Sequence, residues 1–454
     1  MRRIIRFLSY TSAILGLVTI LRPRSGLARV SLWFPKLLAG AWSPFLALAG
    51  LVAALASLAR HDWRATAAGL LGGSLALRHV KKVTARHGQF EEAFGPEWQS
   101  RIRPELRVRL RGKRYAPWRR RDHVRARRHR DIVYASDPST GAPLYADLWQ
   151  PPPDVPSTGL GIVYVFGGGW HYMHRRLWIG RFLERLAGWG HCVMAFDYVL
   201  APQAGLADMV ASVHDAVSWL VEDGQTYGVD PDGIVLMGSS SGAHLALLAA
   251  YAADHPAYAH PGVSPDTYVK AVVSFSAFAD LLRTQAYFQQ EFGALLTGRS
   301  AAERWFVAIG NRIFRRWGLL PPGGQNIPPA QLLPSLLGCT PAADPEPYIV
   351  GSPLAHVGPH CPPTLLFHGS HDFSGIVADG RRLHQALLRE GIPAIYVEYP
   401  GTDHAFELMT MGASTWSPVL QAGLYDLERF LALMAGTGGE PRPLDVAAMK
   451  GILR

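Results

Sequence analysis

The stretch Gly238-Ser239-Ser240-Ser241-Gly242 decides how the rest of the chain is interpreted. It follows a short apolar run, residues 234–237, and precedes an apolar, helix-favouring run, residues 243–251. A strand, a G-x-S-x-G turn and a helix in this order are typical of a tight turn that lifts one serine hydroxyl clear of a sheet. The flanking glycines are expected because a side chain at either position would collide with the neighbouring strand or helix. The pattern therefore predicts Ser240 as a nucleophile whose backbone amide lies at a helix start, where negative charge is favoured.

Two polar segments downstream supply the partners that such a serine needs. A serine hydroxyl becomes reactive only when a base accepts its proton and a third group orients that base. The segments His368-Gly369-Ser370-His371-Asp372 and Gly401-Thr402-Asp403-His404 each follow a predicted strand. Because carboxyl ends of parallel strands share one edge of a sheet, we predict Asp372 as the acid and His404 as the base. His368, His371 and Asp403 are competitors for these roles, and surface polar positions are expected for them.

A glycine-rich segment, Phe166-Gly167-Gly168-Gly169-Trp170, stands at the end of an earlier apolar strand. Three glycines let backbone amides face a developing oxyanion without obstruction by side chains, an effect of roughly 3 kcal/mol per donor. We therefore predict that the oxyanion hole lies in this loop. Trp170 and Ser239, which adjoin the two motifs, are expected to line the substrate pocket.

The chain from residue 131 onward alternates short apolar runs with helical patterns, which predicts a mostly parallel sheet with helices on both faces. The expected strands are 131–135, 144–149, 161–166, 191–198, 233–237, 270–275, 363–368 and 394–399, and the expected helices are 179–187, 207–222, 242–253, 380–389 and 418–434. An insertion over about 279–345 has no strand signal and is expected to form a cap. Within it, aromatic and aliphatic residues recur at helical spacing among arginines: Trp305, Phe306, Ile309, Ile313, Phe314 and Trp317. This pattern indicates a helix packed on the core or a basic amphipathic helix that touches a bilayer.

Taken together, these features resemble the hormone-sensitive-lipase and acetyl-esterase group of α/β hydrolases. The resemblance rests on the glycine loop with its tryptophan, a D-Y-x-L-A-P segment at residues 197–202, the serine turn after the fifth strand, and the later Asp and His. It covers about residues 131–435, and the GSSSGAHL and GGGW segments are also similar to kynurenine formamidase and related small esterases. The resemblance implies an α/β-hydrolase fold, a serine carboxylesterase or lipase-like activity, and no metal or organic cofactor. By the same analogy, the amides of Gly167, Gly168 and Ser241 form the oxyanion hole.

The sequence departs from this family at one position. The family's loop opens with a histidine, which mainly supports the glycine loop by hydrogen bonding, and Phe166 stands there instead. His171, just after Trp170, is a candidate substitute. This departure leaves open a non-catalytic scaffold that keeps the hydrolase fold as an interaction surface. An arylformamidase- or peptidase-like enzyme that cleaves amides also stays open, because the same triad serves both reactions and the shape of the pocket decides between them.

The N-terminal 87 residues are expected to associate with a membrane. Residues 37–59 carry no charge over 23 positions, which is long enough for one helix to cross the hydrocarbon core. Residues 7–21 and 65–77 are shorter apolar stretches that predict interfacial or packed helices, and the first also has the basic start of a signal peptide.

Basic charge is concentrated after these apolar segments. The whole chain has a net charge of +10, and residues 78–130 contain 18 lysines and arginines against 5 acidic residues. A nucleic-acid site is one interpretation, but basic residues next to apolar segments are typical of anchoring to anionic cytoplasmic lipid. We therefore expect membrane lipid and a lipophilic ester as partners rather than nucleic acid, with the catalytic part in the cytoplasm.

The chain is accordingly expected to divide into four parts: a membrane-associated region (1–87), an Arg-rich linker or surface arm (88–130), a catalytic domain (131–440) and a C-terminal tail (441–454). Three widely spaced cysteines argue for neither a disulfide framework nor a zinc site. The acyl chain length, the alcohol moiety and the oligomeric state are not specified by any motif.

Overall fold

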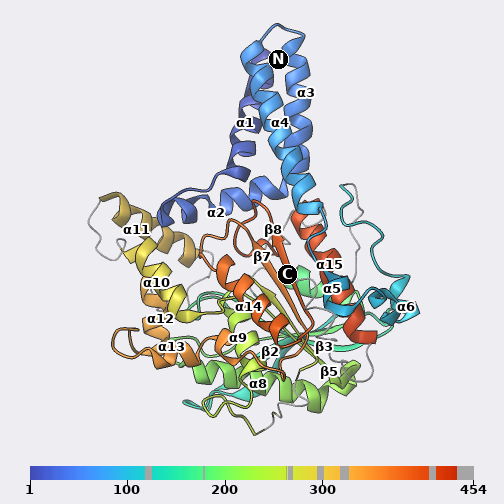
Figure 1. Ribbon diagram of the computed structural model, residues 1–454, viewed down its shortest axis with the longest axis vertical. Helices are drawn as coiled ribbons and strands as arrows, with labels where there is room; N and C mark the ends of the chain where they lie inside the picture. Colours follow the sequence, from blue (N-terminus) through green and yellow to red (C-terminus); the bar gives the residue numbers. More distant parts are fainter. Residues whose placement is uncertain are drawn as a thin grey trace.

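The computed structural model describes residues 1–117, 125–176, 179–261, 263, 269–293, 301–316, 327–407 and 416–436. The predicted tail 441–454 and Trp317 lie outside these residues, and so do the side chains of Trp305, Phe306, Ile313 and Phe314. Within the described chain, an α/β domain carries a narrow helical stalk, which we define as helices α1, α3 and α4 (Figure 1).

All eight predicted strands are present and form one sheet in the order β1-β2-β4-β3-β5-β6-β7-β8. They are β1 (Arg127–Ser136), β2 (Pro143–Gln150), β3 (Gly159–Val165), β4 (Cys192–Phe196), β5 (Val229–Ser239), β6 (Ala271–Phe275), β7 (Thr364–Gly369) and β8 (Ala394–Tyr399). β2 pairs antiparallel with β1 and β4, and the remaining pairs are parallel. Every residue of β4, β6 and β7 is buried, as expected for strands that helices cover on both faces.

The predicted helices flank this sheet. They are α7 (Gly180–Ala187), α8 (Leu206–Asp223), α9 (Ser241–Tyr251), α14 (Val377–Arg389) and α15 (Pro418–Gly436), with the short η2 (Gly224–Tyr227) before β5. The insertion between β6 and β7 is helical, as expected: α10 (Leu281–Phe292), α11 (Ala301–Arg316), α12 (Pro329–Leu337), α13 (Glu346–Val350) and η4 (Pro353–His356). The sheet order and the crossover helices give the chain the α/β-hydrolase fold.

The predicted linker 88–130 is, in its described part, neither a loose linker nor a surface arm. It forms α5 (Phe90–Phe94), η1 (Trp98–Arg101) and α6 (Pro104–Arg107), and then enters β1. Phe94 lies 6.2 Å from Phe430 of α15 between ring centroids, and Trp98 is 4% exposed. Arg114 forms an ion pair with Asp426 of the same helix. The arginines obscured this packing in the sequence, because their apolar neighbours pack on α15 while the guanidinium groups of Arg111 and Arg114 pair with its carboxylates.

The N-terminal region contains α1 (Arg2–Ile20), α2 (Gly26–Ala41), α3 (Ser43–Leu58) and α4 (Trp63–Thr84). The prediction of one spanning helix over 37–59 is wrong, since the chain bends by 72° between α2 and α3. Pro44 lies in the first turn of α3, where its missing N–H costs nothing, so it starts a helix instead of kinking one. The helix α2 lies across the base of the stalk, against the α/β domain (Figure 1).

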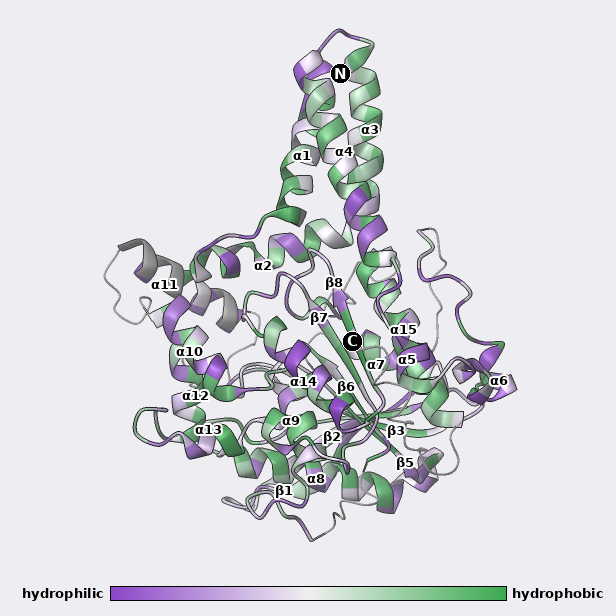
Figure 2. Ribbon diagram, viewed as in Figure 1, coloured by the Kyte–Doolittle hydropathy of each residue, from purple (hydrophilic) through white to green (hydrophobic). Residues whose placement is uncertain are grey.

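The stalk helices pack through small residues and turn large apolar side chains outward. At Gly72 of α4, an added Cβ would lie 2.2 Å from the backbone carbon of Ser12 in α1, so only glycine permits this approach. Ser9, Ser12 and Ser57 are buried, while Phe7 and Leu55 are each 68% exposed. Figure 2 shows the hydrophobic colour over most of the stalk. Of the single helices described, α1 is long and apolar enough to cross a membrane, and the bent pair α2–α3 passes the same test only when taken together.

Candidate active site

The serine turn has the strained geometry that its sequence predicts. Ser240 lies between the end of β5 and the first residue of α9, with φ 55° and ψ −124°, a region that non-glycine residues rarely occupy. Its amide donates to the carbonyl oxygen of Phe275 in β6, which holds the turn against the sheet. At Gly242 an added Cβ would lie 2.2 Å from the carbonyl oxygen of Val165, so the helix approaches β3 closely only without a side chain there. The turn thus presents the Ser240 hydroxyl beyond the edge of the sheet.

The structure brings Ser240, His404 and Asp372 into one hydrogen-bonded line. The Ser240 Oγ lies 2.9 Å from His404 Nε2, and His404 Nδ1 lies 2.8 Å from Asp372 Oδ2. The two partners come from loops after β7 and β8, neighbouring parallel strands. With Nδ1–H donated to the carboxylate, Nε2 is free to accept the serine proton. This is the relation that general-base activation of a serine requires.

The electrostatics of the pair favour a basic imidazole. Burial opposes charge on His404, but the Asp372 carboxylate outweighs it through its charge and its hydrogen bond and raises the pKa of His404 above the ordinary 6.5. Burial likewise opposes charge on Asp372, but His404 and a hydrogen bond from Ser374 keep the pKa of Asp372 below its ordinary value. The sequence analysis missed Ser374. The amide of Ser374 donates to Asp372 Oδ1 at 2.9 Å, and its position two residues after the aspartate is the signal that could have revealed this contact.

The glycine loop lies against the nucleophile. An added Cβ at Gly167 would come within 3.0 Å of the Cβ of Ser240, so the loop passes directly beside the reactive hydroxyl. Ser241 begins α9, and its amide therefore belongs to the unpaired first turn of a helix. The loop and the helix start thus meet at Ser240, where a tetrahedral oxyanion would form.

Phe166 and His171 share the support of this loop. Phe166 stacks on Tyr198, with ring centroids 4.5 Å apart, and the Tyr198 hydroxyl donates to the Phe166 carbonyl oxygen at 3.0 Å. The ring of His171 reaches the carbonyl oxygen of Gly169 through Nδ1 at 2.7 Å and Ser335 of α12 through Nε2 at 3.1 Å. A buried histidine therefore hydrogen-bonds the glycine loop from a position five residues after the family's histidine, as the substitution hypothesis requires.

The positions of Ser239 and Trp170 do not support their predicted role in the substrate pocket. The Ser239 hydroxyl donates to the buried carboxyl group of Glu407, beneath the turn. Trp170 is fully buried, and its Nε1 donates to His244 Nδ1 at 3.3 Å. Alternation along β5 turns Ser239 into the core while Ser240 emerges at the strand's end.

The three competing residues near the triad are not at the surface either. His368 and Asp403 are each 1% exposed, and His371 is partly buried. Burial raises the pKa of Asp403 to about 6, and the nearby Asp372 charge adds to this. Burial lowers the pKa of His371 to about 4, with Lys36 and Arg22 adding to the effect. The surface prediction was wrong for two reasons. His368 belongs to β7 and is packed against α14, and the loops that carry His371 and Asp403 are covered by α2, which is far away in the sequence.

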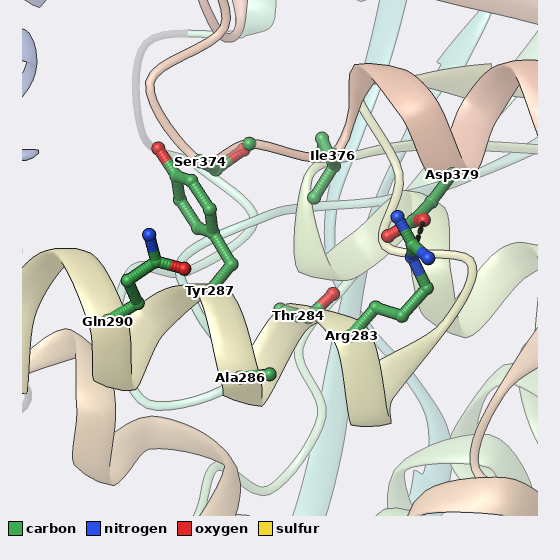
Figure 3. Close-up of a pocket in the computed structure, with 9 residues that line it drawn as sticks. Arg283, Thr284, Ala286, Tyr287, Gln290, Ser374, Ile376 and Asp379 are labelled. Atoms are coloured by element: carbon green, nitrogen blue, oxygen red, sulfur yellow. Dashed lines mark hydrogen bonds and ion pairs between the residues drawn. The ribbon is translucent and has the colours of Figure 1, made fainter. Parts of the chain in front are cut away.

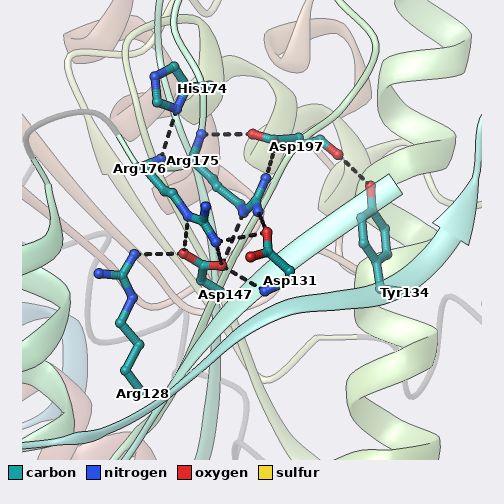
Figure 4. Close-up of polar contacts among 8 residues, drawn as sticks. All are labelled: Arg128, Asp131, Tyr134, Asp147, His174, Arg175, Arg176 and Asp197. Atoms are coloured by element: carbon teal, nitrogen blue, oxygen red, sulfur yellow. Dashed lines mark hydrogen bonds and ion pairs between the residues drawn. The ribbon is translucent and has the colours of Figure 1, made fainter. Parts of the chain in front are cut away.

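A polar cluster fixes the segment that follows the glycine loop (Figure 4). Arg175 pairs with Asp131, Asp147 and Asp197, and its amide also donates to Asp197 at 2.9 Å. Arg176 donates to Asp147 through Nε and Nη2, both at 2.8 Å. Burial disfavours the Asp147 charge, but hydrogen bonds from Arg176 and Arg128 hold the pKa of this carboxyl well below its ordinary value. Asp197, the first residue of the D-Y motif, thus ties the loop to the sheet.

A surface cavity of about 310 Å³ opens beside the acid loop (Figure 3). Its lining comes from α10 and the segment after Asp372: Arg283, Thr284, Ala286, Tyr287, Gln290, Ser374, Gly375, Ile376 and Asp379. Neither Ser240 nor the glycine loop lines it, so this cavity is not the place where an acyl group would meet Ser240.

The cysteines and potential metal ligands offer no other centre in the described chain. Cys192 and Cys361 are buried, Cys339 is partly exposed, and all three are free thiols. Within the described ranges, no group of three or more His, Cys, Asp or Glu residues could hold a metal ion. The hydrogen-bonded triad is therefore the arrangement on which a chemical function can be argued.

Comparison with known proteins agrees with this reading. The BD-FAE family model matches residues 147–308, which include the glycine loop and Ser240. The chain is 26% identical over 323 residues to the probable carboxylic ester hydrolase LipM of Mycobacterium tuberculosis, covering 69% of this chain and 65% of LipM. It is 24% identical over 345 residues to esterase LipQ of the same organism, covering 75% of this chain and 73% of LipQ.

Among solved structures, esterase 2 of Thermogutta terrifontis is 21% identical to this chain. The superposition covers 69% of this chain and 97% of the esterase, with a TM-score of 0.47. The chain has the α/β-hydrolase fold, and in sequence it is similar to the BD-FAE family and to proteins named as esterases. These similarities fit the resemblance to the hormone-sensitive-lipase-like esterases, since LipM, LipQ and LipC of Mycobacterium tuberculosis are named as esterases or as a probable carboxylic ester hydrolase.

Proposed function

We propose that the protein is a membrane-anchored serine hydrolase that cleaves carboxylic esters. The observation that carries the proposal is the unbroken hydrogen-bonded line from Asp372 through His404 to Ser240, at a turn whose strain exposes the serine. The names of the sequence relatives support an ester as the substrate.

The reaction follows from the geometry. Ser240 Oγ attacks the ester carbonyl carbon while its proton passes to His404 Nε2, and Asp372 stabilises the resulting imidazolium. The amides of Gly167, Gly168 and Ser241 are proposed to hold the oxyanion of the tetrahedral intermediate. When the intermediate collapses, the C–O bond to the alcohol breaks and His404 returns the proton to the leaving oxygen. Water, deprotonated by His404, then attacks the acyl-enzyme and releases the acid and free Ser240.

The two alternative functions are supported less well. An amide-cleaving enzyme would use the same triad, but the relatives' names favour esters. A non-catalytic scaffold would rest on the loss of the family histidine at Phe166, yet His171 hydrogen-bonds the glycine loop instead.

The composition of the stalk supports membrane anchoring. Helices in lipid pack through small residues and place large apolar side chains outward, the reverse of a soluble bundle. At 1.5 Å per residue, the 19-residue α1 is about 28 Å long, close to the thickness of a hydrocarbon core. Arg22 and Arg24 follow α1, and Lys81 and Lys82 end α4, so these basic residues lie at the base of the stalk. They favour a catalytic domain on the cytoplasmic side, although arginines at the stalk tip oppose this.

The catalytic proposal is tested by fluorophosphonate labelling of the detergent-solubilised full chain, wild type beside Ser240→Ala. We expect the wild type alone to be labelled and to hydrolyse p-nitrophenyl esters, with anilide analogues as the amide comparison. Folded wild-type protein that is neither labelled nor active would refute the enzyme proposal. A preference for anilides over esters would favour the amide alternative.

Anchoring is tested by flotation with vesicles that contain anionic lipid. The full chain should float with the vesicles and resist extraction at alkaline pH, whereas a variant with Phe7, Leu55 and Leu71 changed to Asp should not. Release of the wild type by high salt alone would show surface attraction in place of insertion.

A further inference from the structure

The helix α2 presents three side chains to the two catalytic loops. Arg29, Trp33 and Lys36 are spaced i, i+4 and i+7, so they lie on one face of the helix. That face meets the segments around Asp372 and His404, more than 300 residues later in the chain. The sequence describes these residues as part of a basic, apolar N-terminal region, and nothing there indicates a role in the site.

The side chain of Trp33 contacts the backbone of His404. The indole Nε1 donates to the carbonyl oxygen of His404 at 2.7 Å. The Trp33 ring also packs edge-on against Phe373, with centroids 5.8 Å apart, and Phe373 in turn lies 5.2 Å from the imidazole. One indole therefore touches the loop of the base and the loop of the acid.

Asp403 joins the same two loops from within. Its Oδ1 accepts hydrogen bonds from the amide of His404 at 2.9 Å and from the amide of Phe373 at 3.0 Å. These amides follow Asp403 and Asp372 directly, so a single carboxylate oxygen fixes the spacing between base and acid. Asp403 is 1% exposed, and a carboxylate so deeply buried needs a counter-charge.

Lys36 supplies that charge from outside the α/β domain. Its ammonium group is 3.5 Å from Asp403 Oδ2 and 3.4 Å from His371 Nδ1, and the side chain is 3% exposed. Arg29 adds a third link, because it donates to the Tyr287 hydroxyl at 2.6 Å, and that hydroxyl donates to the carbonyl oxygen of Phe373 at 2.8 Å. The three side chains of α2 thus converge on the residues adjoining the triad.

We propose that Lys36 and Trp33 are positioning residues for the triad, and that α2 completes the active site by holding the His404 loop and the Asp372 loop in register through Asp403. The inference rests on the proposed function, because it concerns the rate of the same reaction. It follows that the N-terminal region contributes to catalysis, by positioning the triad, as well as to membrane anchoring. Loss of a positioning contact should lower kcat with little change in KM, since the contacts of Trp33 and Lys36 go to the His404 carbonyl oxygen and to Asp403, which orient the triad.

The test is a double-mutant cycle on Lys36 and Asp403 in the full chain, with a p-nitrophenyl acetate assay normalised to fluorophosphonate-titrated sites. Titration removes the effect of any misfolded fraction. Lys36→Met should lower kcat per site roughly ten- to a hundredfold and leave KM within about twofold. Asp403→Asn keeps an oxygen acceptor for the two amides and should cost less. In the Asp403→Asn background, Lys36→Met should cause no further loss of kcat, because the carboxylate that Lys36 pairs with is gone and the substitution also removes the buried ammonium left without its partner.

Two further variants make the test decisive. Lys81→Met removes an exposed lysine of α4 and should match the wild type. Trp33→Phe keeps an aromatic ring but loses the donor to the His404 carbonyl, and should lower kcat about threefold to tenfold if one hydrogen bond is lost. This variant covers the case in which Lys36→Met does not fold.

The outcomes separate the two proposals. An unlabelled, inactive wild type would refute the esterase function itself. An active wild type whose Lys36→Met and Trp33→Phe variants turn over normally per titrated site would overturn the positioning role. Equal losses from Lys36→Met in both Asp403 backgrounds would also overturn it, because the lysine would then act without the carboxylate.

Discussion

The stalk and the α/β domain are built with opposite arrangements of the same residue types. In the stalk, Leu55 is exposed and Ser57 is buried, whereas in the sheet Leu366 is fully buried. An apolar side chain gains from leaving water but gains little from leaving lipid, so the arrangement of each region indicates the solvent for which it is suited. The helix α2 lies where the two regions meet. There the charged and aromatic side chains Arg29, Trp33 and Lys36 form hydrogen bonds or ion pairs with the α/β domain.

The largest expected effect is on activity, and it separates ester hydrolysis by the α/β domain from membrane binding by the stalk. Ser240→Ala should reduce ester hydrolysis by at least about 10⁴-fold, because the nucleophile is lost, while vesicle flotation stays unchanged. Parallel assays of activity and flotation on one preparation check this. A Ser240→Ala protein that no longer floats would show that the two regions do not act independently.

Removal of the Asp147 charge should destabilise the α/β domain strongly. Asp147→Asn leaves Arg175 and Arg176 without their shared buried carboxylate, which costs about 3–5 kcal/mol. Urea unfolding in detergent, followed by tryptophan fluorescence, measures the loss, with exposed Asp154→Asn as the matched control. Because the pKa of Asp147 is lowered in the folded state, the wild type's advantage should persist above about pH 4 and shrink as the pH falls further. An Asp147→Asn variant as stable as Asp154→Asn would contradict this account of the cluster.

The same substitution in each region should give unequal results. Leu366→Ala opens a cavity in the core of β7 and should cost about 2–5 kcal/mol. Leu55→Ala, on the outer face of α3, should change stability in detergent by less than about 0.5 kcal/mol. Equal losses of stability would mean that Leu55 is covered by protein. That result would contradict the description of the stalk as a bundle whose large apolar side chains face outward.

The smallest effect concerns pH. Since Asp372 raises the pKa of His404 above 6.5, the imidazole loses its capacity as a base as the pH falls through that raised value. The acid limb of kcat/KM should therefore have its midpoint above pH 6.5, measured with an uncharged ester. A midpoint below pH 6.5 would show that burial outweighs the Asp372 charge.

Much of the catalytic domain could be predicted from its sequence because its signals are local. All eight strands and the flanking helices follow from apolar runs and turn residues, and Ser240, Asp372 and His404 each stand directly after a predicted strand. In a parallel sheet that placement puts all three at one edge. The order of the motifs along the chain was therefore enough to predict that Ser240, Asp372 and His404 lie together.

Contacts between distant segments could not be predicted in this way. The sequence described residues 37–59 as one apolar run, but the break before Ser43 and the packing of α2 on the catalytic loops direct the chain back over the active site. Asp403 was expected at the surface for the same reason, since the lysine that covers it precedes it by 367 positions.

The sequence by itself therefore determined the elements, their order and the candidate chemistry of Ser240, because these depend on residues a few positions apart. The tertiary structure alone decided which groups surround that chemistry: His171 beneath the glycine loop, Ser239 turned into the core, and Lys36 beside Asp403. Burial and pairing of charge depend on which surfaces meet, and that is set by packing of the whole chain and not by any local pattern.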